Sequence, residues 1–272
     1  MTVYVTADTH LGHRKISAYS GRRFCLDERE LDFLDSKTPL RGRGVSDGWL
    51  PSDASIERMD NYLLDRINET VGVDDELYHL GDFCFGPRGN RMGQWAERYR
   101  RQIKCRRVYL VWGNHDDARI GHLFTKTYNR YRMRWNGIRI ILTHCAHAVW
   151  EGSHRGGWHL YGHSHTTAER AMDLFSSPFY SKLVDCETAS EVRHLVERIC
   201  PAISHSIDRR IEDIREFQTG RRSMDVGVDN AYRVFGEYRP LSLDEIGEYF
   251  SSRPGYSIDH HKEDGEEDEQ ER

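Results

Sequence analysis

Short apolar segments recur along the first 165 residues, each bounded by polar or glycine-rich turns, and five of them constrain the fold most strongly. They are four to six residues long, which is the length of buried strands and too short for most helices. Amphipathic helical patterns lie between them, and strands that alternate with helices favour an α/β fold with a mixed sheet. The segments are residues 3–7, 77–80, 108–112, 138–143 and 159–162.

A β-hairpin and several helices are predicted from local patterns. Asn136 and Gly137 separate two segments in which apolar and polar residues alternate, and an Asn-Gly pair suits the tight turn of a hairpin. Residues 224–228 predict a further strand. Helical spacing of apolar residues appears over residues 56–67, over 92–103 after a candidate N-cap at Asn90, and over 246–250 after a capping box of Ser242 and Glu245.

Two stretches are expected to be insertions into a single domain that covers residues 1–258. Residues 34–53 are rich in Gly, Ser, Asp and Arg and show no periodicity, which predicts a loop. Residues 168–222 carry two helical patterns and predict a helical hairpin on or beside the main sheet, where it could form a cap or a contact between subunits. The tail over residues 259–272 has eight acidic and two basic side chains and is predicted to be disordered.

Composition excludes several classes of protein. A chain of 272 residues can bury a sufficient core without disulfide bonds or a structural metal ion. Its six cysteines include no Cys-x-x-Cys pair, which favours a reducing compartment. We find no signal-peptide pattern and no run near the roughly 18 apolar residues of a membrane span. The whole chain has a net charge of −5, but the tail alone carries −6, so residues 1–258 are nearly neutral, and no DNA- or RNA-binding motif is present. We therefore expect a cytoplasmic protein without a membrane partner.

Histidine is enriched, with 15 in the chain and eleven of them in the first 165 residues. Polar clusters follow the five apolar segments, and ligands of open α/β sheets bind beyond the carboxyl ends of strands. Imidazole, carboxylate and carboxamide groups together suit ions such as Mn, Fe, Zn, Co or Ni. Seven ligands, taken from the side chains of these clusters, are too many for one tetrahedral ion and suit two ions that share a carboxylate and promote displacement at phosphorus. The clusters are Asp8-Thr9-His10, Gly81-Asp82, Gly113-Asn114-His115-Asp116, His144 and Gly162-His163-Ser164-His165.

In this order, the five clusters resemble the sequence blocks of the calcineurin-like metallophosphoesterases. Residues 8–13, 78–83 and 225–229 are similar to a small bacterial and phage-type subgroup of that family. The resemblance implies a four-layer αββα sandwich that hydrolyses phosphate mono- or diesters through a hydroxide bridging two metal ions. The chain departs from the subgroup after His144, where Cys145 stands near the place of a proline, and this concerns the substrate side of the site.

The resemblance also implies a role for each site residue. His115 would be the general acid that protonates the leaving oxygen, and Asp116 would orient the turn that carries it. The two divalent ions would be Mn, with Fe, Zn, Ni or Co as alternatives. The implied ligands are Asp8, His10 and His165 for the first ion, Asp82 as the bridge, and Asn114, His144 and His163 for the second.

Other assignments stay open at the level of sequence. Arginine can bind phosphate through two hydrogen bonds, although an arginine-rich loop can equally be solvated surface. Cys84 and Cys145 adjoin ligand positions and are interpreted as structural thiols. The substrate would be a phosphodiester or a nucleotide, and the alternatives are a non-catalytic metal-binding scaffold or a nuclease acting on nucleic-acid ends. The candidate substrate contacts are His13, Arg14, Arg22 and Arg23.

Overall fold

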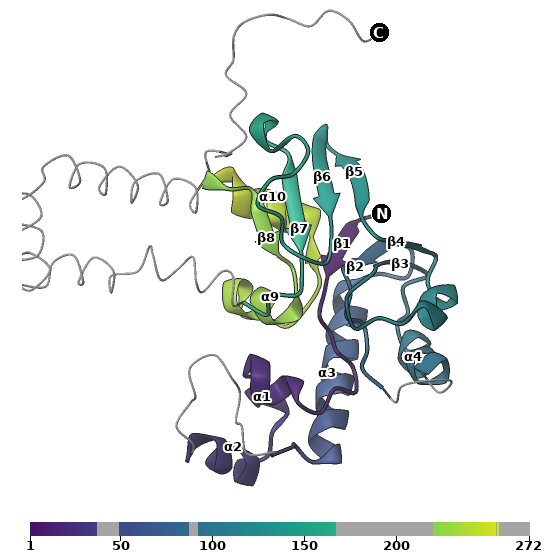
Figure 1. Ribbon diagram of the computed structural model, residues 1–272, viewed down its shortest axis with the longest axis vertical. Coiled ribbons are helices and arrows are strands. Elements are labelled where there is room, and N and C mark those ends of the chain that lie inside the picture. Colours follow the sequence, from purple (N-terminus) through teal and green to yellow (C-terminus); the bar gives the residue numbers. More distant parts are fainter. Residues whose placement is uncertain (37–48, 87–91, 167–219, 254, 256–272) are drawn as a thin grey trace, which may run out of the picture.

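The computed structural model describes residues 1–36, 49–86, 92–166, 220–253 and 255. In Figure 1 these residues form two β-sheets accompanied by helices. This is the mixed α/β sandwich that the sequence predicts. Four predicted features lie wholly or largely outside the described residues: the cap at Asn90, the loop within 34–53, the helical insertion within 168–222 and the tail over 259–272.

The first sheet has five strands in the spatial order β4-β3-β2-β1-β9. Strands β1 to β4 run parallel, and β9 pairs antiparallel with β1 at one edge. Because parallel strands end at the same edge of a sheet, the loops that follow β1, β2 and β3 lie next to one another. The strands are β1 (Val3–Thr6), β2 (Glu76–His79), β3 (Arg107–Val111), β4 (Lys126–Tyr128) and β9 (Leu241–Ser242).

The second sheet has four strands in the order β5-β6-β7-β8 and begins with the predicted hairpin. Asn136 and Gly137 have φ angles of 47° and 81°, as a type I′ turn requires, and they join β5 to β6. Strands β6, β7 and β8 are parallel, and a bridge between Ala7 and Gly227 brings the ends of β1 and β8 together. The strands are β5 (Tyr131–Trp135), β6 (Ile138–Leu142), β7 (Trp158–Tyr161) and β8 (Ser223–Asp225).

Two hydrophobic cores lie on opposite faces of the first sheet, and the period-two alternation of its strands fills both. Leu77 in β2 joins the core beneath helices α3 and α4, whereas its neighbour Tyr78 joins the core between the sheets. The α-helices are α1 (Ile16–Ser20), α2 (Glu28–Asp35), α3 (Asp53–Thr70), α4 (Met92–Arg100), α9 (Val228–Phe235) and α10 (Leu243–Ser251). The 3-10 helices are η1 (Arg23–Cys25), η2 (Ala118–Leu123) and η3 (Ser153–Arg155).

Most predicted elements of the described residues are confirmed. The two interior helical patterns correspond to α3 and α4, and Ser242 and Glu245 form the predicted capping box of α10. The strand predicted over 224–228 is wrong in its second half, because β8 has three residues and α9 begins within this range. None of the helices in the described ranges has the length and apolar character that a bilayer span requires.

Candidate metal centre

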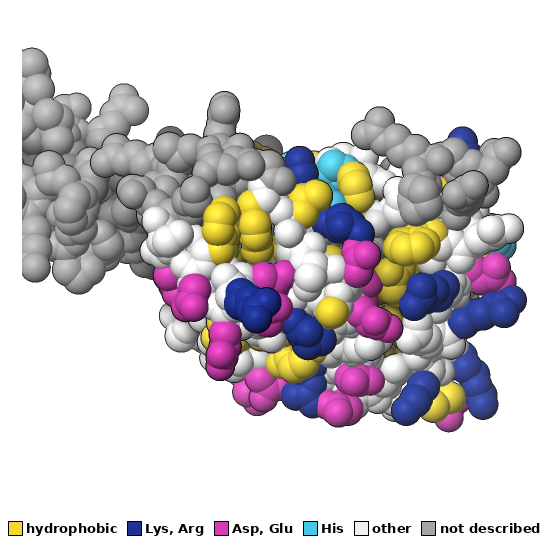
Figure 2. Space-filling model, turned by 90° about the horizontal axis from the view of Figure 1, so that it is seen from below, with side chains coloured by type: hydrophobic (Ala, Val, Ile, Leu, Met, Phe, Trp, Pro, Cys, Tyr) yellow, Lys and Arg dark blue, Asp and Glu magenta, His cyan; other side chains and the backbone are white. Residues whose placement is uncertain are grey.

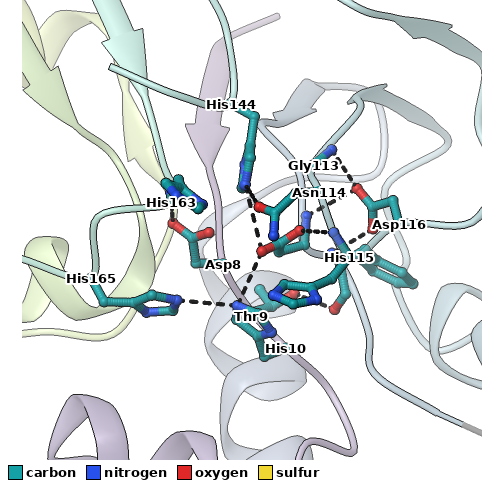
Figure 3. Close-up of polar contacts among 12 residues, drawn as sticks. Asp8, Thr9, His10, Gly113, Asn114, His115, Asp116, His144, His163 and His165 are labelled. Atoms are coloured by element: carbon teal, nitrogen blue, oxygen red, sulfur yellow. Dashed lines mark hydrogen bonds and ion pairs between the residues drawn. The ribbon is translucent and has the colours of Figure 1, made fainter. Parts of the chain in front are cut away.

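The structure brings the seven predicted metal ligands to the carboxyl ends of strands from both sheets. Figure 3 shows side chains from these ends turned toward a common space. His10 and His165 meet there although 155 positions separate them in the sequence. The ligands are distributed as Asp8 and His10 after β1, Asp82 after β2, Asn114 after β3, His144 after β6, and His163 and His165 after β7.

Asp8, His10 and His165 offer ligand atoms that all lie within 4.8 Å of one another. The Nε2 atoms of His10 and His165 are 3.1 Å apart. Oδ1 of Asp8 is buried and has no hydrogen-bond partner among the described residues, which is costly unless a cation binds it. Burial and then the charge of Asp225 raise the pKa of Asp8 well above its usual value. A metal ion here would offset both effects.

The proton on His165 is placed by a carboxylate behind the ring. Nδ1 of His165 lies 2.7 Å from Oδ2 of Asp229, which is buried and only accepts hydrogen bonds when it is ionised. Burial opposes ionisation, but the charges and hydrogen bonds of Arg22 and His165 together outweigh it and lower the pKa of Asp229. Nδ1 therefore carries the proton, and Nε2 presents its lone pair toward His10. A histidine held in this way is prepared to bind a metal ion.

Asp82 lies between the two groups of predicted ligands. Its Oδ2 is 3.4 Å from Nε2 of His10 and 3.5 Å from Nε2 of His144. Its Oδ1 accepts a hydrogen bond from the backbone N–H of His115 at 2.9 Å. The ligand atoms of Asp8, Asp82 and His144 also lie within 4.8 Å of one another. This position suits a carboxylate that bridges two ions.

His144 is oriented from its outer side. Its Nδ1 lies 2.7 Å from the carbonyl oxygen of Leu80, which can only accept, so Nδ1 carries a proton and Nε2 faces the site. Nε2 is 2.8 Å from Oδ1 of Asn114. Burial lowers the pKa of His144, but the hydrogen bond and charge of Asp82 outweigh burial and raise it. The oxygen atoms around Nε2 therefore attract positive charge, whether a proton or a metal ion carries it.

His163 completes the second group. Its ring lies 5.0 Å from that of His144, and its backbone N–H donates to Oδ2 of Asp8 at 2.8 Å. Burial lowers the pKa of His163 and lowers that of His10 strongly, so both favour the neutral imidazole that binds metals. Imidazoles with carboxylates and one carboxamide fit divalent transition ions better than Mg²⁺ or Ca²⁺, which prefer oxygen ligands.

Asp116 ties together the loops that carry Asp82 and Asn114. Its Oδ2 accepts hydrogen bonds from the backbone N–H groups of Asp82 and Gly113, both at 2.9 Å. Its Oδ1 accepts another from the N–H of Phe83 at 3.0 Å. Charge-assisted hydrogen bonds of this kind are about twice as strong as neutral ones. Asp116 therefore fixes the two loops relative to each other.

The backbone of the site is held in an uncommon conformation. Among the described residues, seven that are not glycine have a positive φ angle, and five of these are predicted ligands. Residues other than glycine rarely adopt this left-handed conformation, and it persists where surrounding contacts enforce it. Packing is also close, because a Cβ added to Gly113 would lie 2.3 Å from Oδ1 of Asp82. The five ligands are Asp8, His10, Asp82, His163 and His165, with φ between 45° and 70°.

The centre has a buried floor and an exposed rim. The ring of His115 lies 5.7 Å from that of His10, so the predicted general acid stands beside the ligands. A buried floor keeps the ligands in place, while an exposed rim leaves room for a substrate. The floor consists of side chains that are at most 5 % exposed, namely Asp8, His10, Asp82 and His144. The exposed residues of the rim are Asn114, His115 and His163.

His13 lies beside the first group of ligands. Its ring is 5.4 Å from that of His10 and 4.2 Å from that of Phe85. Burial lowers the pKa of His13 to about 4, and the charge of His115 contributes, so His13 is neutral at pH 7. A neutral imidazole here can exchange hydrogen bonds with a substrate but adds no charge to the site.

The three candidate arginines occupy different surroundings. Arg14 and Arg23 are exposed and pair with Asp53 and Asp35. Arg22 is fully buried, so the expectation that it contacts substrate is wrong. The cost of burying its charge is offset by internal partners, which leave no face of the guanidinium for a ligand. Arg22 donates two hydrogen bonds to the carboxylate of Asp229 and one each to the carbonyl oxygens of Asp8 and Thr9.

Sequence reasoning missed the roles of Arg22 and Asp229. Asp229 belongs to the stretch 225–229 that resembles the subgroup, yet no role was predicted for it. The structure places it in the first turn of α9. A signal for α9 was present, since Val228 and Ala231 recur at helical spacing and both are buried.

The chain is similar to known proteins at the level of a family. A family model described as calcineurin-like phosphoesterase matches residues 1–175, a range that includes the seven predicted ligands and His115 and stops before Asp229. A search of curated proteins found no significant match. A similar solved structure is a protein of unknown function from Aquifex aeolicus, with 18% identity and a TM-score of 0.47, covering 91% of this chain and 98% of that chain.

Proposed function

We propose, because this chain belongs to the calcineurin-like phosphoesterase family, that it hydrolyses phosphate mono- or diesters with two divalent transition-metal ions. The observation that carries the proposal is the position of Asp82, whose Oδ2 lies within 3.5 Å of ligand nitrogens from both groups. The first ion would be held by Asp8, His10 and His165, and the second by Asn114, His144 and His163, with Asp82 shared.

Residues of the buried floor would hold the ions, and His115 at the exposed rim would donate the proton. When bound, two divalent ions lower the pKa of water and stabilise negative charge on the ester. His115 at the rim donates a proton to the leaving oxygen as its bond to phosphorus breaks. The backbone N–H of His115 donates to Oδ1 of Asp82, so one carboxylate would position both the ions and the general acid.

A nuclease that acts on nucleic-acid ends is an alternative within the same chemistry. On the face that Figure 2 shows, basic and acidic side chains are interspersed rather than gathered by sign. On this face, a substrate with several phosphates would bind through single exposed side chains, and Arg14 and Arg23 are exposed arginines near the first predicted ligands in the sequence. The second alternative is a metal-binding scaffold without catalysis.

The test uses the full chain, stripped with a chelator and reloaded with Mn²⁺, Fe²⁺, Zn²⁺, Co²⁺ or Ni²⁺. Its substrates are aryl and alkyl phosphate mono- and diesters, nucleotides and oligonucleotides. We expect turnover that depends on metal and is abolished in Asp82→Asn. His115→Gln should lower kcat by about 10²–10⁴-fold on alkyl esters and by less on aryl esters, whose leaving groups need less protonation. His122→Gln, at an exposed histidine of η2, is the matched control.

Each outcome points to one reading of the protein. Two bound ions per chain without turnover on any ester would show that the protein is a metal-binding scaffold and not an enzyme. Turnover restricted to oligonucleotides, with a steep dependence on salt, would favour the nuclease. An equal effect of His115→Gln on aryl and alkyl esters would contradict the role of His115 as general acid, but it would not contradict the assignment of the protein as a hydrolase.

A further inference from the structure

A third group of ligand atoms contains a cysteine that the roles above leave unused. Sγ of Cys145 forms a group with ring nitrogens of His144 and His163 in which all three atoms lie within 4.8 Å of one another. His144 belongs to the buried floor, whereas Cys145 and His163 are exposed. The group therefore extends the second metal position from the floor toward solvent.

Cys145 differs from the other cysteines of the described residues. Cys25 and Cys105 are buried, and their Sγ atoms donate to backbone carbonyl oxygens at 3.1 and 3.3 Å. Cys84 is buried in the core beneath the helices. These three thiols have the surroundings of small core residues. Cys145 instead is exposed and has two imidazoles beside its sulfur.

The backbone around this group is fixed on both sides. The hydroxyl of Thr143 donates to the carbonyl oxygen of Cys145 at 2.7 Å, and the N–H of Gly162 donates to the carbonyl oxygen of His144 at 2.8 Å. The N–H of His163 is held by Asp8, as described above. Ligands on a backbone held in this way lose little conformational freedom when they bind an ion.

We propose that Cys145 binds the second metal ion as a thiolate, together with His144 and His163. The proposal rests on the proposed function, because it assumes a metal ion at that position. The thiol proton leaves to solvent as the metal–sulfur bond forms, so the step needs no oxidant or reductant. Thiolate is a soft ligand that favours ions such as Zn²⁺ over Mn²⁺. The second position would therefore select a thiophilic ion, in contrast to the Mn expected from the family resemblance.

Titration of the metal-free full chain with Co²⁺ tests this, because Co²⁺ gives two separate signals. Bands in the visible region report bound Co²⁺ with any ligands, and a charge-transfer band in the near ultraviolet reports a bond to sulfur. The wild type and the control Cys105→Ser should show both. Cys145→Ser should keep the visible bands and lose the charge-transfer band. The affinity of Cys145→Ser for Zn²⁺ should fall by about 10–100-fold or more, since removal of a group that only supports a ligand already has an effect of this size. Its affinity for Mn²⁺ should be retained.

The outcomes separate this proposal from the function on which it rests. Two results would overturn the thiolate ligand without contradicting the metal centre. One is visible bands without a charge-transfer band in the wild type, and the other is a charge-transfer band that survives in Cys145→Ser. Absence of all cobalt absorption in the wild type would overturn the metal centre together with the thiolate. Equal losses of Zn²⁺ and Mn²⁺ affinity in Cys145→Ser would show a general disturbance of the loop and would also overturn the proposal.

Discussion

Oδ2 of Asp229 lies 2.7 Å from Nδ1 of His165, and the same carboxylate receives hydrogen bonds from Arg22 at 2.8 and 2.9 Å. Arg22 also donates to the carbonyl oxygen of Asp8, a second predicted ligand of the first metal position. One buried anion thus links the predicted metal ligand His165 to Arg22, an internal cation that lies 207 positions before that anion in the sequence. The geometry of the first position depends on this pair.

Replacing Asp229 by Asn is expected to damage both metal binding and stability. Without the carboxylate, the proton on Nδ1 of His165 is less well placed, and metal affinity should fall by about 10–100-fold. Arg22 would become a buried cation without an anion, which should lower the free energy of unfolding by about 3–5 kcal/mol. Calorimetric metal titration and denaturant unfolding measure the two effects. Asp244→Asn, at an exposed residue of α10, is the control, and wild-type affinity in Asp229→Asn would refute the positioning role.

Replacing Asp116 by Asn should loosen the two loops that it joins. The amide group can keep one acceptor oxygen, but it then places an NH₂ group against the backbone N–H of Phe83 or against those of Asp82 and Gly113. The lost acceptor should cost about 1–3 kcal/mol of stability. Hydrogen exchange should show faster exchange at these three amides. Unchanged protection of all three would contradict the role given to Asp116.

Metal binding at the second position should weaken as pH falls. Burial lowers the pKa of His144, but Asp82 outweighs burial and raises it above 6.5, so a proton competes with the ion for Nε2. Below this raised pKa, the apparent affinity should drop by about tenfold per pH unit, and above it the affinity should level off. Titration of metal affinity between about pH 5 and 8 measures the slope. An affinity that does not change over this range would argue against His144 as a ligand.

Asp60 should make the protein less stable as pH rises from acid to neutral. Burial raises its pKa to about 6, against hydrogen bonds from the N–H of Gly12 and the hydroxyl of Tyr99. Because the folded pKa exceeds the unfolded value of 3.8, its contribution to stability is full below that value and is lost as pH rises through about 6. A shift of about two units corresponds to about 3 kcal/mol.

The variant Asp60→Asn removes this titration and should gain stability relative to the wild type between about pH 4 and 7. Chemical unfolding at a series of pH values measures the difference. Asp65→Asn, at an exposed aspartate of the same helix, should give a difference that is constant with pH. A constant difference for Asp60→Asn as well would show that Asp60 titrates normally in the folded protein.

Features that depend on neighbouring residues could be predicted from the sequence. The hairpin needs only the backbone freedom of Asn136 and Gly137, and the cap of α10 needs only Ser242 and Glu245 three residues later. The seven ligands could be predicted to lie together because each follows a strand, and parallel strands end at a common edge. Their binding of metal stays a prediction.

Features that depend on distant partners could not be predicted. Arg22 stands in a polar stretch, and nothing in its neighbours distinguishes an arginine facing solvent from one paired with a buried carboxylate such as Asp229. Helix α9 was missed because its first residue, Val228, continues the apolar pattern of β8. In both cases the deciding contact comes from the tertiary structure.

The position of Asp229 in the chain also bears on how the protein is made. The ribosome adds Asp229 64 residues after His165, so a growing chain presents the histidines of the first position before their supporting carboxylate exists. Until then, the carboxylate that pairs with Nδ1 of His165 and with Arg22 is missing. Selective uptake of metal at the first position should therefore follow chain release, and a translation product stalled near residue 175 should bind ions weakly and without discrimination.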